Sequence, residues 1–188
     1  DIKNILESNG LYEARVLSAC DYISVPKDWH FILKEDSKKI RKELILNYWK
    51  SFSFLLPKTM MIFEEYLDDI FVISHYNQVK MVYLFVIDDD YIVYVGNYPS
   101  SDSKIAILPE KLREFYMHIH NGWFESISGG LGLLPVEKIQ FLDESEWGLP
   151  EEILQSVELS KTYYVFHNGG GGFLCINIEN ATNPKSLV

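Results

Sequence analysis

Three histidines are the first candidates for chemistry in this chain. His118 and His120 form a His-x-His pair, and His167 follows later in the sequence. On a strand, the imidazoles of His118 and His120 would share one face and could bind zinc. We expect them instead in the last turn of a helix, where they would point roughly 200° apart. The spacing therefore predicts no metal site. A zinc-dependent hydrolase that uses all three histidines is the enzyme alternative.

The other motifs with chemical potential have simpler explanations. Gly169-Gly-Gly-Gly172 could cradle a phosphate, but a strand-like apolar run follows it where a helix N-terminus would be needed. Asp88-Asp-Asp90 is expected to be a solvated hairpin turn. Cys20 and Cys175 are too few for a disulfide framework, and neither has a basic cluster beside it. We therefore expect neither an enzyme nor a protein that carries a cofactor.

Acidic residues gather between Glu137 and Glu158 around aromatic side chains. This segment has seven carboxylates and one lysine, a net charge of −6, with Phe141 and Trp147 among them. Such a run can be no more than a solvated face. It is equally what a protein needs in order to mask a basic active site. The charged residues are Glu137, Lys138, Asp143, Glu144, Glu146, Glu151, Glu152 and Glu158.

Length and composition set the limits for these alternatives. The 188 residues, 47% of them hydrophobic, can bury a real core and are too apolar for a disordered chain. The net charge of −10 is uneven, with −1 on residues 1–80 and −9 on residues 81–188. An acidic half disfavours nucleic acid and favours a basic partner.

The compartment follows from the cysteines and from hydropathy. No signal peptide opens the sequence, and no apolar run has the length of a membrane span. We expect a soluble, cytoplasmic protein that does not bind a membrane. The sequence starts at Asp1 and not at Met, so we also expect a fragment.

Apolar spacing predicts the main elements. Residues 36–50 and the segment after Pro57 have helical periodicity, whereas residues 70–73 suit either a helix end or a strand. Residues 81–87 and 91–95 are β-branched and aromatic, which predicts a hairpin. A helix should begin near Pro109 and end at Asn121-Gly122. Later elements are a short strand at 131–134, a helix from Pro150, and strands at 163–166 and 173–178.

The C-terminal half carries an ordered set of short motifs. A Leu108-Pro109 start precedes Phe115-Tyr116 and Asn121-Gly122. Gly129-Gly130 leads to the strand that ends at Pro135. Glu137, Ile139, Asn168-Gly-Gly and Phe173 to Ile176 complete the pattern. In this order and spacing, the motifs resemble the SUKH superfamily, the Smi/Knr-type domains, over about residues 105–180.

This resemblance implies an α+β fold, with a mainly antiparallel, twisted sheet packed by helices. The patterns of the first hundred residues add an N-terminal helical and hairpin extension. We expect the chain to consist of the extension, residues 1–100, which is either a separate module or part of the same unit, and a SUKH-like domain, residues 101–188. Residues 1–100 have no recognisable counterpart in the family, and the chain ends sooner than family domains usually do.

The resemblance also implies a function in protein binding. Many bacterial members are immunity proteins that bind and neutralise a cognate polymorphic toxin, often a nuclease. Others are regulatory scaffolds, which is the alternative here. The implied mechanism is occlusion, in which carboxylates imitate phosphate in a basic cleft and Trp123, Phe124 or Trp147 anchors the contact. The expected partner-binding residues are Trp123, Phe124, Glu137, Asp143, Glu144, Glu146, Trp147, Glu151 and Glu152.

Overall fold

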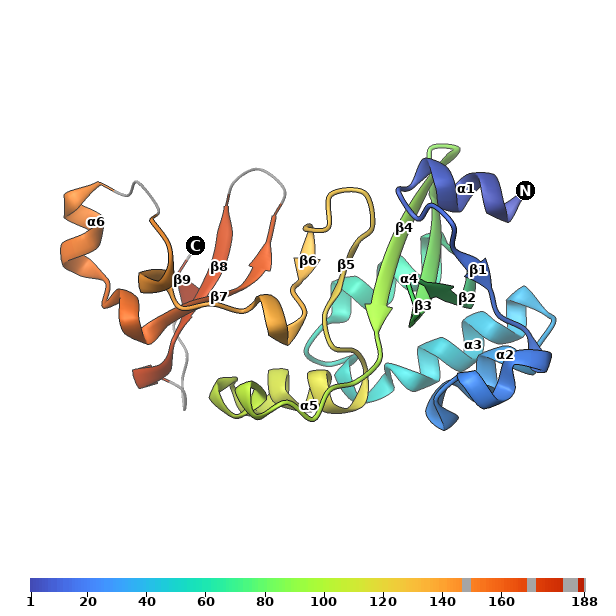
Figure 1. The fold of residues 1–188 in the computed structure, drawn as a ribbon, viewed down its shortest axis with the longest axis horizontal. Coiled ribbons are helices and arrows are strands. Elements are labelled where there is room, and N and C mark those ends of the chain that lie inside the picture. The colour runs from blue at the N-terminus through green and yellow to red at the C-terminus, as the bar shows by residue number, and fades with distance from the viewer. Residues whose placement is uncertain (147–149, 169–171, 181–185, 188) are drawn as a thin grey trace. The chain divides into compact units, whose positions relative to one another are not determined.

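The computed structural model describes residues 1–146, 150–168, 172–180 and 186–187, and the chain forms two compact units. Unit 1 comprises Asp1–Tyr98 and Glu125–Gly129, and unit 2 comprises Pro99–Phe124 and Gly130–Val188. Both contain antiparallel strands and helices (Figure 1), which confirms the α+β class. The predicted domain boundary at residue 100 stays a prediction. Unit 1 includes Glu125–Gly129 in addition to the N-terminal residues.

The sheet of unit 1 consists of antiparallel neighbours in chain order. Tyr76 and Asn77 have φ of 48° and 59°, and Asp88 and Asp89 have φ of 50° and 67°. Positive φ at both central residues is the signature of the tight hairpin turns that match the twist of a sheet. Asp88-Asp89 is therefore the turn of the predicted hairpin, and residues 70–73 belong to a strand. The strands are β1 (Arg15–Val16), β2 (Leu67–His75), β3 (Gln78–Ile87) and β4 (Asp90–Asn97).

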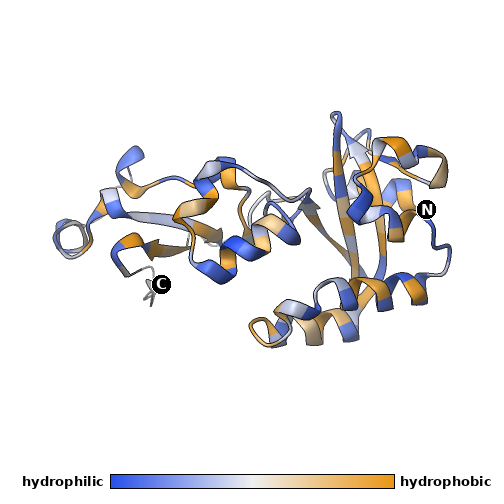
Figure 2. Ribbon diagram, turned by 90° about the horizontal axis from the view of Figure 1, so that it is seen from below, coloured by the Kyte–Doolittle hydropathy of each residue, from blue (hydrophilic) through white to orange (hydrophobic). Residues whose placement is uncertain are grey.

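Helices of unit 1 pack against this sheet. The two predicted helices are confirmed as α3 (Lys38–Tyr48) and α4 (Pro57–Tyr66), which contact β2 and β3. Figure 2 shows hydrophobic and hydrophilic stretches alternating along the helices, as expected of elements that bury one side. The remaining elements are α1 (Ile2–Ser8), α2 (His30–Leu33), η1 (Ala19–Ser24), η2 (Lys27–Trp29) and η3 (Lys50–Phe52).

An aromatic cluster forms the core of unit 1 where α3 and α4 meet β3. The ring of Phe63 lies 5.0 Å from Trp49, 5.5 Å from Tyr83 and 5.6 Å from Phe85. The indole of Trp49 donates a 2.9 Å hydrogen bond to the hydroxyl of Tyr83, although both side chains are buried. Burial raises the pKa of Tyr83 well above its ordinary value, so its phenol stays neutral. This contact fixes the orientation of two large rings.

The short segment Glu125–Gly129 is held within unit 1 by hydrogen bonds. The backbone N–H of Ser126 donates to the carbonyl of Val93 at 2.9 Å, and its hydroxyl donates to the carbonyl of Asn9 at 2.9 Å. The carboxylate of Glu125 accepts from the N–H groups of Ile127 and Ser128. These bonds satisfy backbone groups that no helix or sheet pairs here.

Unit 2 contains its own antiparallel strands, a helix and several 3₁₀ turns. The expected elements after Pro109 are present, and the helix ends at His118. Its elements are η4 (Ser103–Ile107), α5 (Glu110–His118), β5 (Trp123–Glu125), β6 (Gly132–Leu133), η5 (Val136–Lys138), η6 (Leu142–Glu144), α6 (Glu151–Ser156), η7 (Leu159–Lys161), β7 (Thr162–His167), β8 (Phe173–Asn177), η8 (Ile178–Asn180) and β9 (Ser186–Leu187).

Buried tyrosines connect the parts of unit 2. The hydroxyl of Tyr116 donates to the carbonyl of Leu134, and that of Tyr163 donates to the carbonyl of Ile107. Burial raises the pKa of both phenols, so both remain donors across the ordinary pH range. Tyr116 therefore links α5 to the residue after β6, while Tyr163 links β7 to η4.

No helix among the described residues combines the length and the apolar character that crossing a bilayer requires.

Gly122 and Gly129 offer a matched test of how closely the backbone packs around Gly122. Both have positive φ, 81° and 59°. A Cβ on Gly122 would lie 2.6 Å from the backbone nitrogen of Pro135, whereas a Cβ on Gly129 would meet nothing within 4 Å. Gly129→Ala should cost about 1–2 kcal/mol for the left-handed backbone alone. Gly122→Ala should cost about 1–3 kcal/mol more, because backbone atoms must move. Urea unfolding of both variants measures this difference; equal losses would contradict it.

His75 should make the stability of unit 1 depend on pH. Burial, and then the charge of Lys80, lower the pKa of its imidazole below the ordinary 6.5, although the backbone of Tyr12 and the charge of Glu13 act in the opposite direction. Below pH 6.5 the unfolded chain takes up a proton that the folded chain resists, so the free energy of unfolding should fall. Urea unfolding at pH 7.5 and 5.5 tests this. His75→Phe should flatten the dependence, and an unchanged dependence in that variant would assign it to other groups.

Candidate protein-binding surface

The acidic segment begins on a stretch of chain that is fastened to β7. Phe141 forms an isolated antiparallel bridge with Tyr163, and their rings pack edge to face at 5.6 Å. The backbone N–H of Tyr164 donates to the carbonyl of Gln140 at 3.4 Å. These contacts hold residues 140–141 against the sheet of unit 2, so the charged residues on either side start from a fixed backbone.

Short 3₁₀ turns separate the apolar side chains of this stretch from the acidic ones. Val136 and Leu142 are buried, whereas Glu137, Asp143 and Glu144 are exposed. In these turns the apolar residue anchors the backbone and its acidic neighbours face solvent. Glu144 also accepts a 3.2 Å hydrogen bond from the backbone N–H of Phe141, which caps η6.

The acidic character continues through α6 and η7. Glu151 and Glu152 are exposed in the first turn of α6, where the helix dipole favours negative charge. Lys161 follows the C-terminal end of the acidic segment. It forms ion pairs with Glu158 at 2.9 Å and with Glu179 at 2.5 Å. The hydrogen bond to Glu179, followed by that to Glu158, raises the pKa of Lys161. Its charge is thus compensated by its own neighbours.

Glu137 differs from the other carboxylates because it is also a structural residue. The amide nitrogen of Asn121 donates to both oxygens of Glu137, at 2.8 and 3.1 Å. The amide oxygen of Asn121 accepts from the buried backbone N–H of Val136 at 2.8 Å. Asn121 follows α5, so this single side chain joins the end of the helix to η5.

The predicted anchors lie in different environments. Trp123 is half-buried on β5, opposite Leu133, whereas Phe124 is only 8% exposed. Trp147 lies outside the described residues. The carboxylates are exposed, whereas neither of the described aromatic anchors is. Those predicted to bind a partner and found exposed are Glu137, Asp143, Glu144, Glu146, Glu151 and Glu152.

The histidines of the enzyme alternative are in three unlike environments. The helix ends at His118, which is exposed, and His120 follows it with no exposed surface against the ring of Phe115. His167 lies on β7 and stacks on Phe173 at 4.8 Å. Within the described ranges, no group of three or more His, Cys, Asp or Glu side chains is arranged to hold a metal ion. Burial raises the pKa of Cys175, which makes it a poorer nucleophile.

Comparison with known proteins gives one result, which concerns this part of the chain. Residues 106–187 match the model of the SMI1 / KNR4 family (SUKH-1). The SUKH match covers under half of the chain, starts inside η4 and includes all of the acidic segment. No curated protein and no solved structure gives a significant match.

The sequence motifs predicted the roles of Asn121 and Glu137 separately and did not predict the contact between them. Asn121 was expected to end a helix and Glu137 to bind a partner, yet each holds the other. They are separated by the turn and short strands of 122–135, and no periodicity relates them. The proximity of Asn121-Gly122 and Glu137 within the family pattern was the available signal.

Replacing Asn121 should affect stability more than replacing Glu137. Asn121→Ala leaves the buried N–H of Val136 without its acceptor and should lower the free energy of unfolding by about 1–3 kcal/mol. Glu137→Gln keeps a hydrogen-bonding group at an exposed position and should cost under about 1 kcal/mol. Urea unfolding of the two variants provides the comparison. A larger loss in Glu137→Gln would show that the charge, not the backbone contact, stabilises η5.

Proposed function

We propose that this protein is an immunity protein that binds a cognate bacterial toxin domain and neutralises it. The observation that carries the proposal is the coincidence of the SUKH match with the exposed carboxylates of residues 137–152. The family match is consistent with a role in binding protein. The acidic segment supplies the chemistry that a basic partner would recognise.

The proposed mechanism is occlusion of a nuclease active site. A nuclease cleft must attract phosphate, so it presents basic side chains that carboxylates can bind in place of the substrate. Asp143, Glu144, Glu146, Glu151 and Glu152 would provide the charge, while Trp123 and Trp147 would provide apolar contact area. Phe124 would contribute only if binding exposed it, since it is 8% exposed here.

A growth-rescue assay is the primary test of this function. The toxin domain encoded immediately upstream of this gene would be induced in cells with and without this protein, and the two proteins would then be co-purified. Rescue together with a stoichiometric complex is expected. A complex without growth rescue, or the absence of both, would contradict a function in immunity. Either outcome would favour a regulatory scaffold with another protein partner.

Removing charge from the acidic segment should weaken the complex without unfolding the protein. We expect a variant with Asp143→Lys, Glu146→Lys, Glu151→Gln and Glu152→Gln to slow association at low salt by about tenfold or more and to flatten its salt dependence. Glu137 and Glu144 stay unchanged because Glu137 accepts hydrogen bonds from the side-chain amide of Asn121 and Glu144 accepts one from the backbone N–H of Phe141. Glutamines in α6 avoid placing cations at a helix N-terminus. Stopped-flow association at two salt concentrations measures both effects.

The matched control carries the same change in net charge at exposed carboxylates of unit 1. Its substitutions are Glu43→Lys, Glu64→Lys, Glu65→Gln and Asp90→Asn. This control should associate nearly as fast as the unmodified protein. If both variants slow equally, only overall charge matters and the acidic segment is not the contact surface.

A further inference from the structure

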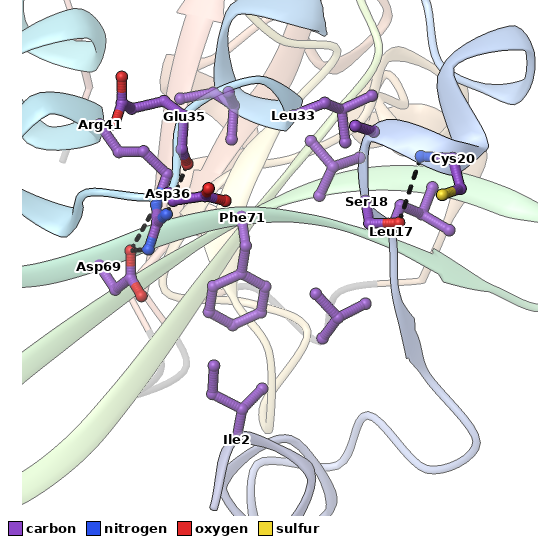
Figure 3. A pocket seen from close by; sticks show the side chains of 14 residues that line it. Ile2, Leu17, Ser18, Cys20, Leu33, Glu35, Asp36, Arg41, Asp69 and Phe71 are labelled. Carbon is purple, nitrogen blue, oxygen red and sulfur yellow. Dashed lines mark hydrogen bonds and ion pairs between the residues drawn. The ribbon is translucent and has the colours of Figure 1, made fainter.

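Unit 1 contains a pocket of about 320 Å³ that is separate from the acidic segment and from the SUKH match. Its walls come from sequence-distant elements, namely α1, the stretch from β1 into η1, α2, the start of α3, and β2. In Figure 3, Arg41 and Asp69 lie at one end and Ser18 and Cys20 at the other, with Phe71 and Ile2 between them. The pocket therefore has a polar end and an apolar middle.

The apolar middle suits a hydrocarbon stem. Phe71 of β2 lies in the middle of the pocket, and Ile2, Val16 and Leu33 add side chains from three other elements. Val16 is 39% exposed, so it stands at the opening. Removing apolar ligand surface from water against such walls is favourable at roughly 25 cal/mol for each Å².

The polar end is organised by a nearly buried ion pair. The Nε and Nη2 atoms of Arg41 both donate to Oδ1 of Asp69, at 2.9 and 2.6 Å, and Nη1 donates to the carbonyl of Glu35 at 2.7 Å. The exposed fractions of the two side chains are 14% for Arg41 and 3% for Asp69. Each guanidinium nitrogen thus donates one hydrogen bond within the protein, and the charge of Arg41 is paired with that of Asp69.

Negative charge exceeds positive charge at this end. Glu35, Asp36 and Asp69 line the pocket with Arg41 as the lining cation, and nearby Lys38 is paired with Asp68 at 2.7 Å. Within the described part of the chain, the hydrogen bonds that Asp69 accepts, including one from the N–H of Ile70, all use Oδ1. The side chain of Asp69 is 3% exposed, and its second oxygen can accept a hydrogen bond from a ligand in the pocket. The carboxylate of Asp36 can do the same.

We propose that this pocket binds an organic cation, an ammonium or guanidinium group carried on an apolar stem. The head group lies beside Asp36, Glu35 and the free oxygen of Asp69, and the stem lies along Phe71, Leu33 and Val16. The volume equals roughly ten water molecules, so the pocket has room for one amine or one basic side chain. This proposal is independent of toxin binding and concerns a different unit.

The test uses the full chain and matched probes. Hexylamine, 1-hexanol and hexanoate share one stem and differ in charge, and the capped peptide acetyl-Leu-Lys-amide presents the same cation from a polypeptide. Titrations followed by ¹H–¹⁵N NMR should show saturable shifts at the amides of Leu17, Leu33 and Val72 with the amine. Hexanol should bind several-fold more weakly and hexanoate not at all. The peptide arm distinguishes a free amine from a basic side chain as the natural source.

Variants localise the binding. The double variant Glu35→Gln, Asp36→Asn should bind hexylamine about three- to tenfold more weakly, as expected for partly exposed charge pairs. Val16→Lys places a cation at the opening and should abolish binding, whereas Ile23→Lys adds the same charge at a 99%-exposed position that does not line the pocket and should not. Equal shifts with hexylamine and hexanol, no shifts at the lining amides at about 10 mM, or unchanged binding in Val16→Lys would each overturn the proposal.

Discussion

The need to cover β2 and β3 determines much of unit 1. From Ile70 to Ile73 and from Met81 to Phe85, every residue is buried, so these strands bury side chains on both faces. A strand of this kind needs packing partners on each side. The aromatic residues of α3 and α4 cover one side through Trp49 and Phe63.

Unit 2 relies on polar groups at specific points more than on long apolar strands. Its strands are short, and the connections between them carry much of its chain. Asn121, Tyr116 and Tyr163 compensate by bonding to the backbone of connections that have no regular ladder. Buried hydrogen bonds of this kind fix conformation because an unmade bond is costly. A rigid backbone in turn gives exposed carboxylates defined positions, which is what selective recognition requires.

Sequence patterns predicted the elements that have a periodicity of their own. α3, α4 and the β3–β4 hairpin were predicted because apolar spacing or β-branched runs mark them. Residues 70–73 stayed ambiguous because burial on both faces removes the alternation that identifies a strand. The Tyr76-Asn77 turn was missed because Tyr rarely adopts positive φ.

The site was predictable in composition but not in geometry. Exposed carboxylates could be expected from their sequence context, since acidic residues are seldom buried unpaired. The double role of Glu137 and the burial of Phe124 depend on contacts with residues far along the chain. The Arg41–Asp69 pair and the pocket around it arise from five separate segments, and no local pattern foretells that assembly.

The chain returns to unit 1 at Glu125–Gly129, so the boundaries of the family match differ from those of the compact units. The family match runs unbroken from 106 to 187, yet within it Ser126 is bonded to the carbonyls of Val93 and Asn9, which the match does not include. An excised family segment would keep its motifs but lose those acceptors. Boundaries drawn at the ends of the family match would therefore separate Ser126 from the two carbonyls of unit 1 to which it donates.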